Sequence, residues 1–137
     1  MEIGAKEECV YRVQPADLAS EVGISKEDDF PEVYATSRMI ALTELSAARL
    51  MKPLLKSDEL SVGVGVDMKH FAPTPVDEQV TALSTFTGMD GKLYCFDVEV
   101  FDRAGKVASG KHTRAIVKTE RLMEGAKDRM ERAESEK

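Results

Sequence analysis

The chain has 137 residues, of which 42% are hydrophobic, and it carries a formal net charge of −6. These values predict one globular domain with a substantial core, residues 1–137, and they exclude a disordered chain. The net negative charge also argues against broad nucleic-acid binding, which depends on clustered positive charge.

No apolar run approaches the ~20 residues that span a bilayer, and the first ten residues lack the apolar region of a signal peptide. We therefore expect a cytoplasmic protein that does not enter membranes. The two cysteines, Cys9 and Cys95, have no metal or redox spacing, which favours two reduced thiols.

The N-terminal part of the chain predicts one strand and then irregular segments. Residues 8–14 alternate between two sets of side chains, which is typical of a strand. Pro15 opens a short helical turn that ends at Gly23, and residues 25–29 (SKEDD) form a charged connection.

Residues 30–55 predict a turn followed by one long helix, around which we expect the chain to fold. Apolar side chains occupy almost every face of this helix, which is typical of a buried helix. Thr36 or Ser37 is a suitable N-cap, at or just inside the first turn, and Pro53 marks the end.

Glu44 lies in the middle of this helix. Its neighbours three and four residues away are all apolar: Ile40, Ala41, Ala47 and Ala48. A carboxylate in such a position must find a partner, become neutral or face a wet pocket.

The second half of the chain predicts four antiparallel strands, over residues 61–71, 79–88, 93–102 and 107–118. In the first of them, one side in strict period two carries Val62, Val64, Val66, Met68 and His70. Gly63 and Gly65 occupy the other side, where glycines usually mean that a backbone or ligand comes close. The tail from residue 120 is mostly charged and predicts a solvated or frayed helix.

This order of elements predicts an α+β fold, an antiparallel sheet wrapped around a long central helix. One small sheet cannot cover an apolar helix on all sides. We therefore expect a homodimer that extends the sheet and covers the remaining face.

Four positions besides Glu44 do not fit the core pattern: Thr36, Gly63, His70 and Arg114. Thr36 and Glu44 are eight residues apart in the sequence, which is about 12 Å on a continuous helix at about 1.5 Å per residue. A site that they share requires a bend, a third group between them or a second subunit.

Five segments together resemble the hotdog-fold thioesterases of the fluoroacetyl-CoA thioesterase type. They are FPEVYAT (30–36), the helix with Glu44, the strand with Gly63, the HFAPTP corner (70–75) and the GKHTRA strand (110–115). The resemblance runs from the first strand to about Thr119. It implies a hotdog fold, a sheet around a central helix that associates as a homodimer.

By motif match, the resemblance implies a catalytic trio of Thr36, Glu44 and His70. It also places Gly63 and Arg114 at the substrate and Phe30 as an aromatic gate. A second lid aromatic of the fluoroacetyl-specific enzyme is replaced here by the charged run 26–29, so selectivity for a fluorinated acyl group does not follow.

Thioester hydrolysis needs a nucleophile, a proton acceptor and stabilisation of the oxyanion. We expect Glu44 to orient His70 or to act directly on water or the acyl carbon, and His70 to transfer protons. The Thr36 hydroxyl attacks or positions water, and N–H groups at the start of the helix face the oxyanion.

The sequence thus predicts a thioesterase that hydrolyses a short-chain acyl-CoA to free acid and CoA. Two alternatives are a non-catalytic acyl-CoA-binding protein and an enoyl-thioester hydratase. No cofactor and no metal are implied, because His70 and His112 lack ligand-like spacing. Four lysines are candidates for the CoA phosphates by their sign alone: Lys69, Lys92, Lys106 and Lys111.

Overall fold

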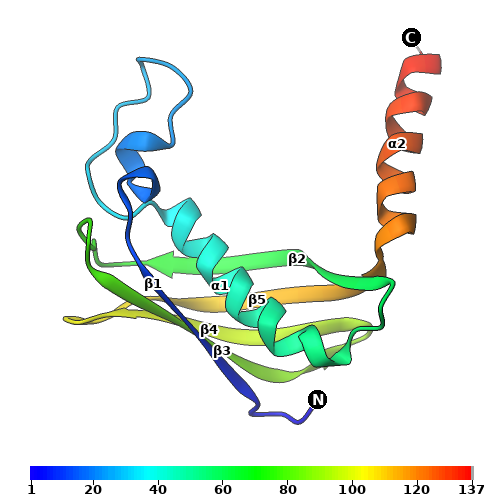
Figure 1. Ribbon diagram of the computed structural model, residues 1–137, viewed down its shortest axis with the longest axis horizontal. Coiled ribbons are helices and arrows are strands. Elements are labelled where there is room, and N and C mark those ends of the chain that lie inside the picture. The colour runs from blue at the N-terminus through cyan, green and yellow to red at the C-terminus, as the bar shows by residue number, and fades with distance from the viewer. Residues whose placement is uncertain (137) are drawn as a thin grey trace.

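The computed structural model describes residues 1–136 and contains one sheet, two α-helices and three short 3₁₀ turns (Figure 1). The strands are β1 (Lys6–Arg12), β2 (Glu59–His70), β3 (Gln79–Asp90), β4 (Leu93–Asp102) and β5 (Gly105–Lys118). The helices are α1 (Thr36–Met51) and α2 (Thr119–Ser135), and the turns are η1 (Pro15–Asp17), η2 (Ala19–Glu21) and η3 (Lys52–Leu54). None of the described helices is long and apolar enough to cross a membrane.

The five strands form one antiparallel sheet in the order β1-β3-β4-β5-β2. This confirms the predicted α+β fold and all five predicted strands, with no end shifted by more than two residues. Strand β2 pairs only with β5, so it forms an edge of the sheet although β3 follows it in the sequence. Its outer N–H and C=O groups are available to another strand.

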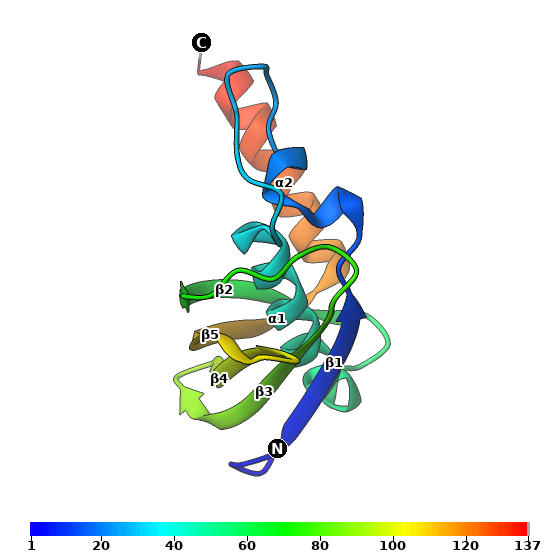
Figure 2. The same ribbon diagram turned by 90° about the vertical axis from the view of Figure 1, so that its left-hand side faces the viewer.

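Helix α1 lies across one face of the sheet (Figures 1 and 2). The side turned to the sheet is buried: Met39, Leu42, Thr43, Ser46, Ala47 and Met51. The opposite side is open, and Leu45 is 47% exposed. The prediction that α1 is buried on almost every face is therefore wrong for the single chain, because one sheet supplies only one covering layer.

The start of α1 is fixed by the segment before it. Ala35 is the N-cap residue and Thr36 is the first helical residue, just inside the first turn. The Tyr34 and Ala35 N–H groups donate to the carbonyls of Thr74 and Asp17. The first bond ties the helix start to the corner that follows β2, and the second ties it to η1.

The alternation predicted for β2 is interrupted by a bulge. The register against β5 shifts between Gly63 and Gly65. As a result Val64 and Val66 are exposed rather than buried. The expected close approach to a strand glycine is confirmed at Gly63, where a Cβ would collide with the Glu44 carboxylate.

Two segments rise from the same face of the sheet at its opposite ends (Figure 1). One is the lobe of residues 13–35, which contains η1 and η2. The other is α2, none of whose side chains is buried, as predicted for the charged tail. Cys9 and Cys95 are both free thiols.

Candidate active site

Thr36 and His70 meet where the start of α1 faces the end of β2. The Thr36 Oγ1 lies 2.9 Å from the His70 Nδ1. Thr36 caps nothing with its side chain, so its hydroxyl is available for this bond. Position 36 also places the hydroxyl beside the first-turn N–H groups, which have no partner within the helix.

A hollow of about 350 Å³ opens beside this pair. Its lining comes from the lobe, from the helix start and from the corner after β2: Ala19, Pro31, Val33, Tyr34, Thr36, His70, Phe71, Ala72 and Pro73. Apart from Thr36 and His70 the lining is mainly apolar, which suits an acyl chain next to two polar groups.

His70 sits half-buried in this hollow. Burial lowers the pKa of His70 below its ordinary value, and a hydrogen bond with the Ala72 backbone acts in the opposite direction. The imidazole is therefore neutral at pH 7 and can accept a proton. Its Nε2 is buried and has no hydrogen-bond partner among the described residues, so this nitrogen is unsatisfied within the single chain.

Glu44 belongs to a second cluster, with Arg114 and His112 of β5. The Glu44 Oε1 lies 3.7 Å from an Arg114 guanidinium nitrogen. The Arg114 side chain is 8% exposed and that of Glu44 is 40% exposed. The Glu44 carboxylate thus has a cationic partner and still reaches the surface.

Arg114 is held in place by several bonds. Its Nε donates to Ser61 Oγ at 3.0 Å, and one terminal nitrogen donates to the Ser61 carbonyl at 2.9 Å. The other terminal nitrogen lies 3.1 Å from His112 Nε2. Burial lowers the pKa of Arg114 while Glu44 opposes this shift, yet an arginine stays protonated.

The Arg114 contact fixes the tautomer of His112. A guanidinium can only donate, so His112 Nε2 accepts and His112 Nδ1 donates to the Gly65 carbonyl at 2.8 Å. Burial lowers the pKa of His112, the bond to Gly65 opposes that shift, and the charge of Arg114 adds to it. His112 is therefore a neutral, fully buried support for Arg114.

Gly63 is required by the approach of Glu44. A Cβ at residue 63 would collide with Glu44 Oε1 and would lie 3.4 Å from His112 Cε1. Gly63 is also the residue opposite Arg114 in the β2–β5 pairing. The glycine therefore makes room for the carboxylate.

The structure brings the predicted residues together as two groups rather than one. Thr36 pairs with His70, and Glu44 gathers with Gly63 and Arg114. Within residues 1–136 no hydrogen bond or ion pair joins Glu44 to Thr36 or His70. The expected orientation of His70 by Glu44 is thus not found within one chain, because the two clusters lie at different heights along α1.

Phe30 is half-exposed in the lobe and does not line the hollow, although its neighbour Pro31 does. Its role as a gate stays a prediction. Among the lysines, Lys106 is paired with Glu99 at 2.6 Å and Lys111 with Asp97 at 2.8 Å.

Sequence reasoning missed the parts of the site that act through other residues. His112 was considered only as a metal ligand, Ser61 was not singled out, and neither was Phe71, an exposed aromatic that lines the hollow. The available signal was the i, i+2 spacing of His112 and Arg114, which puts both on one face of β5.

Comparison with known proteins gives the same family from sequence and from structure. The family described as "Fluoroacetyl-CoA-specific thioesterase" matches residues 13–120. The fluoroacetyl-CoA thioesterase of Streptantibioticus cattleyicolor is 33% identical over 94 residues, which are 69% of this chain and 68% of that protein.

Two solved structures show the fold. A variant of the fluoroacetyl-CoA-specific thioesterase FlK, in complex with fluoroacetate and CoA, superposes with a TM-score of 0.85 at 29% identity and covers 89% of this chain and 99% of its own. A hot-dog-like protein from Thermanaerovibrio acidaminovorans has a TM-score of 0.79 at 24% identity, over 93% and 91% of the two chains. The predicted hotdog fold is confirmed, and the chain belongs to the fluoroacetyl-CoA-specific thioesterase family.

Proposed function

We propose that this protein is an acyl-CoA thioesterase that hydrolyses a short-chain acyl-CoA to the free acid and CoA. The observation that carries the proposal is the Thr36–His70 hydrogen bond at the start of α1, beside an apolar hollow. Membership of a thioester hydrolase family and the CoA complex of the related thioesterase support the substrate class.

In the proposed mechanism the thioester carbonyl lies at the start of α1, where first-turn N–H groups stabilise the oxyanion. Neutral His70 accepts a proton from the Thr36 hydroxyl, or from a water that Thr36 positions. The activated oxygen attacks the thioester carbonyl, and His70 returns the proton to the CoA sulfur as the C–S bond breaks. Where Thr36 has attacked, a water activated by His70 then hydrolyses the acyl-Thr36 ester and releases the free acid. The lowered pKa of His70 keeps it in the accepting form.

Glu44 enters the mechanism, we propose, from the second subunit of a homodimer. When two α1 helices pack antiparallel about a two-fold axis, the start of each helix lies beside the later part of the other. Glu44 of the partner subunit then lies level with Thr36 and with the unpaired Nε2 of His70. The open side of α1 and the free edge of β2 support this arrangement. Arg114 and Gly63 then hold Glu44 at the acyl group.

A short acyl group fits the hollow beside Thr36 and His70, which Phe71 also lines. The related enzyme's named substrate, fluoroacetyl-CoA, is one candidate. The charged run 26–29 in place of a second lid aromatic favours a less restricted choice of short acyl groups. Because Lys106 and Lys111 are paired with acids, Lys69 and Lys92 are the two remaining candidates for the CoA phosphates.

The test is a thiol-release assay over acetyl-, fluoroacetyl-, propionyl-, butyryl- and octanoyl-CoA, with the folded Thr36→Ala variant in parallel. We expect release from short acyl-CoAs and a loss of roughly 100-fold in Thr36→Ala. Thr87→Ala, which removes an exposed hydroxyl on β3, is the matched control and should keep full activity. CoA binding without thiol release would instead indicate a binding protein, and loss of enoyl absorbance without free thiol a hydratase.

A further inference from the structure

Helix α2 stands away from the body of its own chain. It spans 17 residues, and none of its described side chains is buried. It nevertheless carries three exposed apolar side chains: Leu122, Met123 and Met130. Helices in proteins are stabilised mostly by packing an apolar face rather than by intrinsic propensity, so α2 calls for a surface outside its own chain.

The charges of α2 are partly separated around the helix axis. At about 100° per residue, one side carries Arg121, Arg129 and Arg132 together with Leu122 and Ala126. The opposite side carries Glu120, Glu131 and Glu134 together with Lys127, whereas Asp128 and Glu124 lie about 20° and about 60° from Arg121, at the border of the first side. None of the three arginines forms an ion pair with a described residue. The helix therefore presents an unpaired basic and apolar side, which we call the arginine side.

The arginine side faces a hollow of about 830 Å³ in the angle between α2 and the ends of β2 and β5. Its lining combines apolar residues, among them Ile116 and Val117, with the three arginines, Lys118 and one acid, Glu59. This is a receiving surface for a ligand with both apolar and negatively charged groups.

The chain itself contains a segment with that chemistry. Residues 21–32, which we call the acidic loop, contain one lysine and five acids: Glu21, Glu27, Asp28, Asp29 and Glu32. The loop also exposes Ile24, which is 98% accessible, and Phe30. Asp28 accepts bonds from the Ile24 and Ser25 N–H groups at 2.8 and 3.0 Å, so the loop has a defined shape.

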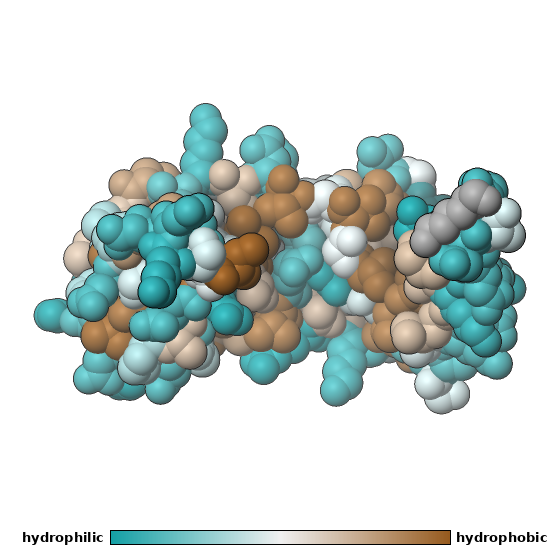
Figure 3. All heavy atoms as spheres, turned by 90° about the horizontal axis from the view of Figure 1, so that it is seen from above, coloured by the Kyte–Doolittle hydropathy of each residue, from teal (hydrophilic) through white to brown (hydrophobic). Residues whose placement is uncertain are grey.

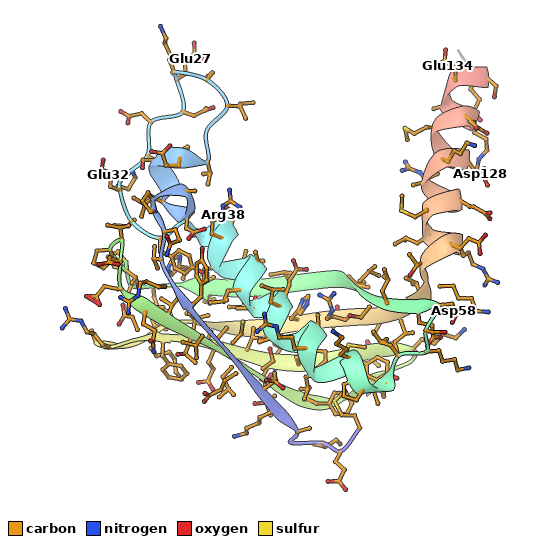
Figure 4. The ribbon with its side chains drawn as sticks, in the orientation of Figure 1. Glu27, Glu32, Arg38, Asp58, Asp128 and Glu134 are labelled. Atoms are coloured by element: carbon orange, nitrogen blue, oxygen red, sulfur yellow. The ribbon has the colours of Figure 1, made fainter. Side chains whose placement is uncertain are left out.

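The acidic loop and α2 lie at opposite ends of one chain and cannot meet within it. Both rise to a similar height on the same face of the sheet, with Glu27 at the tip of the lobe and Glu134 near the end of α2 (Figures 1 and 4). From the side, α2 leans over the β2 edge (Figure 2). From above, apolar surface gathers between the lobe and α2, whereas the tip of the lobe and α2 are mostly hydrophilic (Figure 3).

We propose that α2 of each subunit crosses the β2 edge of the homodimer and docks, by its arginine side, on the acidic loop of the second copy. The inference rests on the dimer proposed above. A two-fold axis that runs perpendicular to the sheet at the β2 edge turns the second subunit end for end. Each acidic loop then lies beside α2 of the other subunit. Opposite charges and exposed apolar groups then face each other across the interface.

This docking has a consequence for the site. The acidic loop contains Pro31 and continues into Val33 and Thr36, and these three residues line the hollow beside His70. A helix from the second subunit that holds the loop therefore sets the shape of the hollow's mouth. Each subunit closes the acyl site of the other.

The test uses two charge-reversed full-length proteins. In the first, Arg121, Arg129 and Arg132 are each changed to Glu. In the second, Glu27, Asp29 and Glu32 are each changed to Lys, with Asp28 left in place because it holds the loop. Dimer dissociation is measured by sedimentation over a dilution series, and native mass spectrometry measures the heterodimer fraction in an equal mixture.

We expect each reversed protein to dimerise at least ~10-fold more weakly than the parent, because like charges then face each other. The mixture should restore both contacts and give well above the statistical half of heterodimers. Glu120→Lys with Glu131→Lys, on the side of α2 opposite the arginine side, is the control and should dimerise normally. Circular dichroism, and a further variant in which the same three arginines are changed to Gln, distinguish loss of docking from unfolding of α2.

Three results would overturn the docking. The first is parental dimer affinity in both reversed proteins, and the second is a statistical mixture. The third is a raised KM for acyl-CoA with an unchanged dimer in the first protein, which would give the arginines to the CoA phosphates. A parent that stays monomeric at all concentrations would instead refute the dimer of the proposed function.

Discussion

Glu44 owes its position to the absence of a side chain at residue 63. A carboxylate on an apolar helix stays charged where a cation is close and where nothing displaces it. Arg114 supplies the cation at 3.7 Å, and Gly63 supplies the space. The site therefore depends on a missing methyl group as much as on the ionisable groups.

We predict that Gly63→Ala folds but loses about 100-fold in kcat, the loss expected when a reacting group is misplaced by about 1 Å. The new Cβ would collide with Glu44 Oε1 and push the carboxylate from the acyl group. The assay is thiol release with a short acyl-CoA. The control is Gly125→Ala on α2, where a Cβ meets nothing within 4 Å. Equal activity of the two variants would show that Glu44 tolerates displacement.

At the scale of elements, the seam between β2 and β5 supports the site. The bulge between Gly63 and Gly65 turns the Gly65 carbonyl to His112, and Ser61 binds Arg114 from the same strand. His112 is 1% exposed, so its protonation would place a second positive charge beside Arg114. The seam should therefore be sensitive to acid.

We predict that the stability of the fold falls as the pH drops below about 6.5, the ordinary histidine pKa. The pKa of His112 is lowered in the folded chain, so the unfolded chain binds the proton first and gains stability as the pH falls. The stability that neutral His112 contributes is fully present above the pKa of the unfolded chain, and it is lost as the pH falls through the pKa of the folded chain. Urea unfolding from pH 7.5 to 5 measures it.

His112→Asn keeps a donor for the Gly65 carbonyl and removes the titrating ring. The variant should be less stable at pH 7.5 but lose less stability than the parent on acidification. His70 also has a lowered pKa, so part of the slope should remain. Parallel curves for parent and variant would exclude His112 as the acid-sensitive group.

How far the elements follow from the sequence depends on whether the signal is local. The strand over residues 93–102 is predicted to the residue, because alternation and turn signals lie within a few positions of it. The bulge in β2 could not be predicted, because a bulge is set by the partner strand rather than by the bulged sequence. The hydrophobic pattern singled out Glu44 and Arg114 and the family resemblance gave them roles, whereas the part played by His112 emerged only from its bond to Arg114.

For the whole molecule, the open side of α1, the free edge of β2 and the projecting α2 all lead to one conclusion. A single chain leaves Leu45, Val64 and Leu122 in water, and it leaves Thr36 and Glu44 in separate clusters. The sequence predicts a dimer because the long helix is apolar on almost every face and one sheet can cover only one side of it. The separation of the site into two clusters could be found only from the structure. A bend before the helix or a third group between Thr36 and Glu44 was equally compatible with their eight-residue spacing.

We predict that two inactive variants restore activity when mixed. In a dimer with shared sites, a His70→Ala chain supplies Glu44 to the intact Thr36 and His70 of a Glu44→Ala chain. Random exchange makes half of the dimers mixed, and each has one complete site of two, so the mixture should reach about a quarter of parental activity. The measurement is thiol release after mixing and equilibration, with each variant alone as the baseline. If all site residues act within one chain, no mixed dimer holds a complete site and the mixture stays inactive. Mass spectrometry of the same sample verifies that exchange took place.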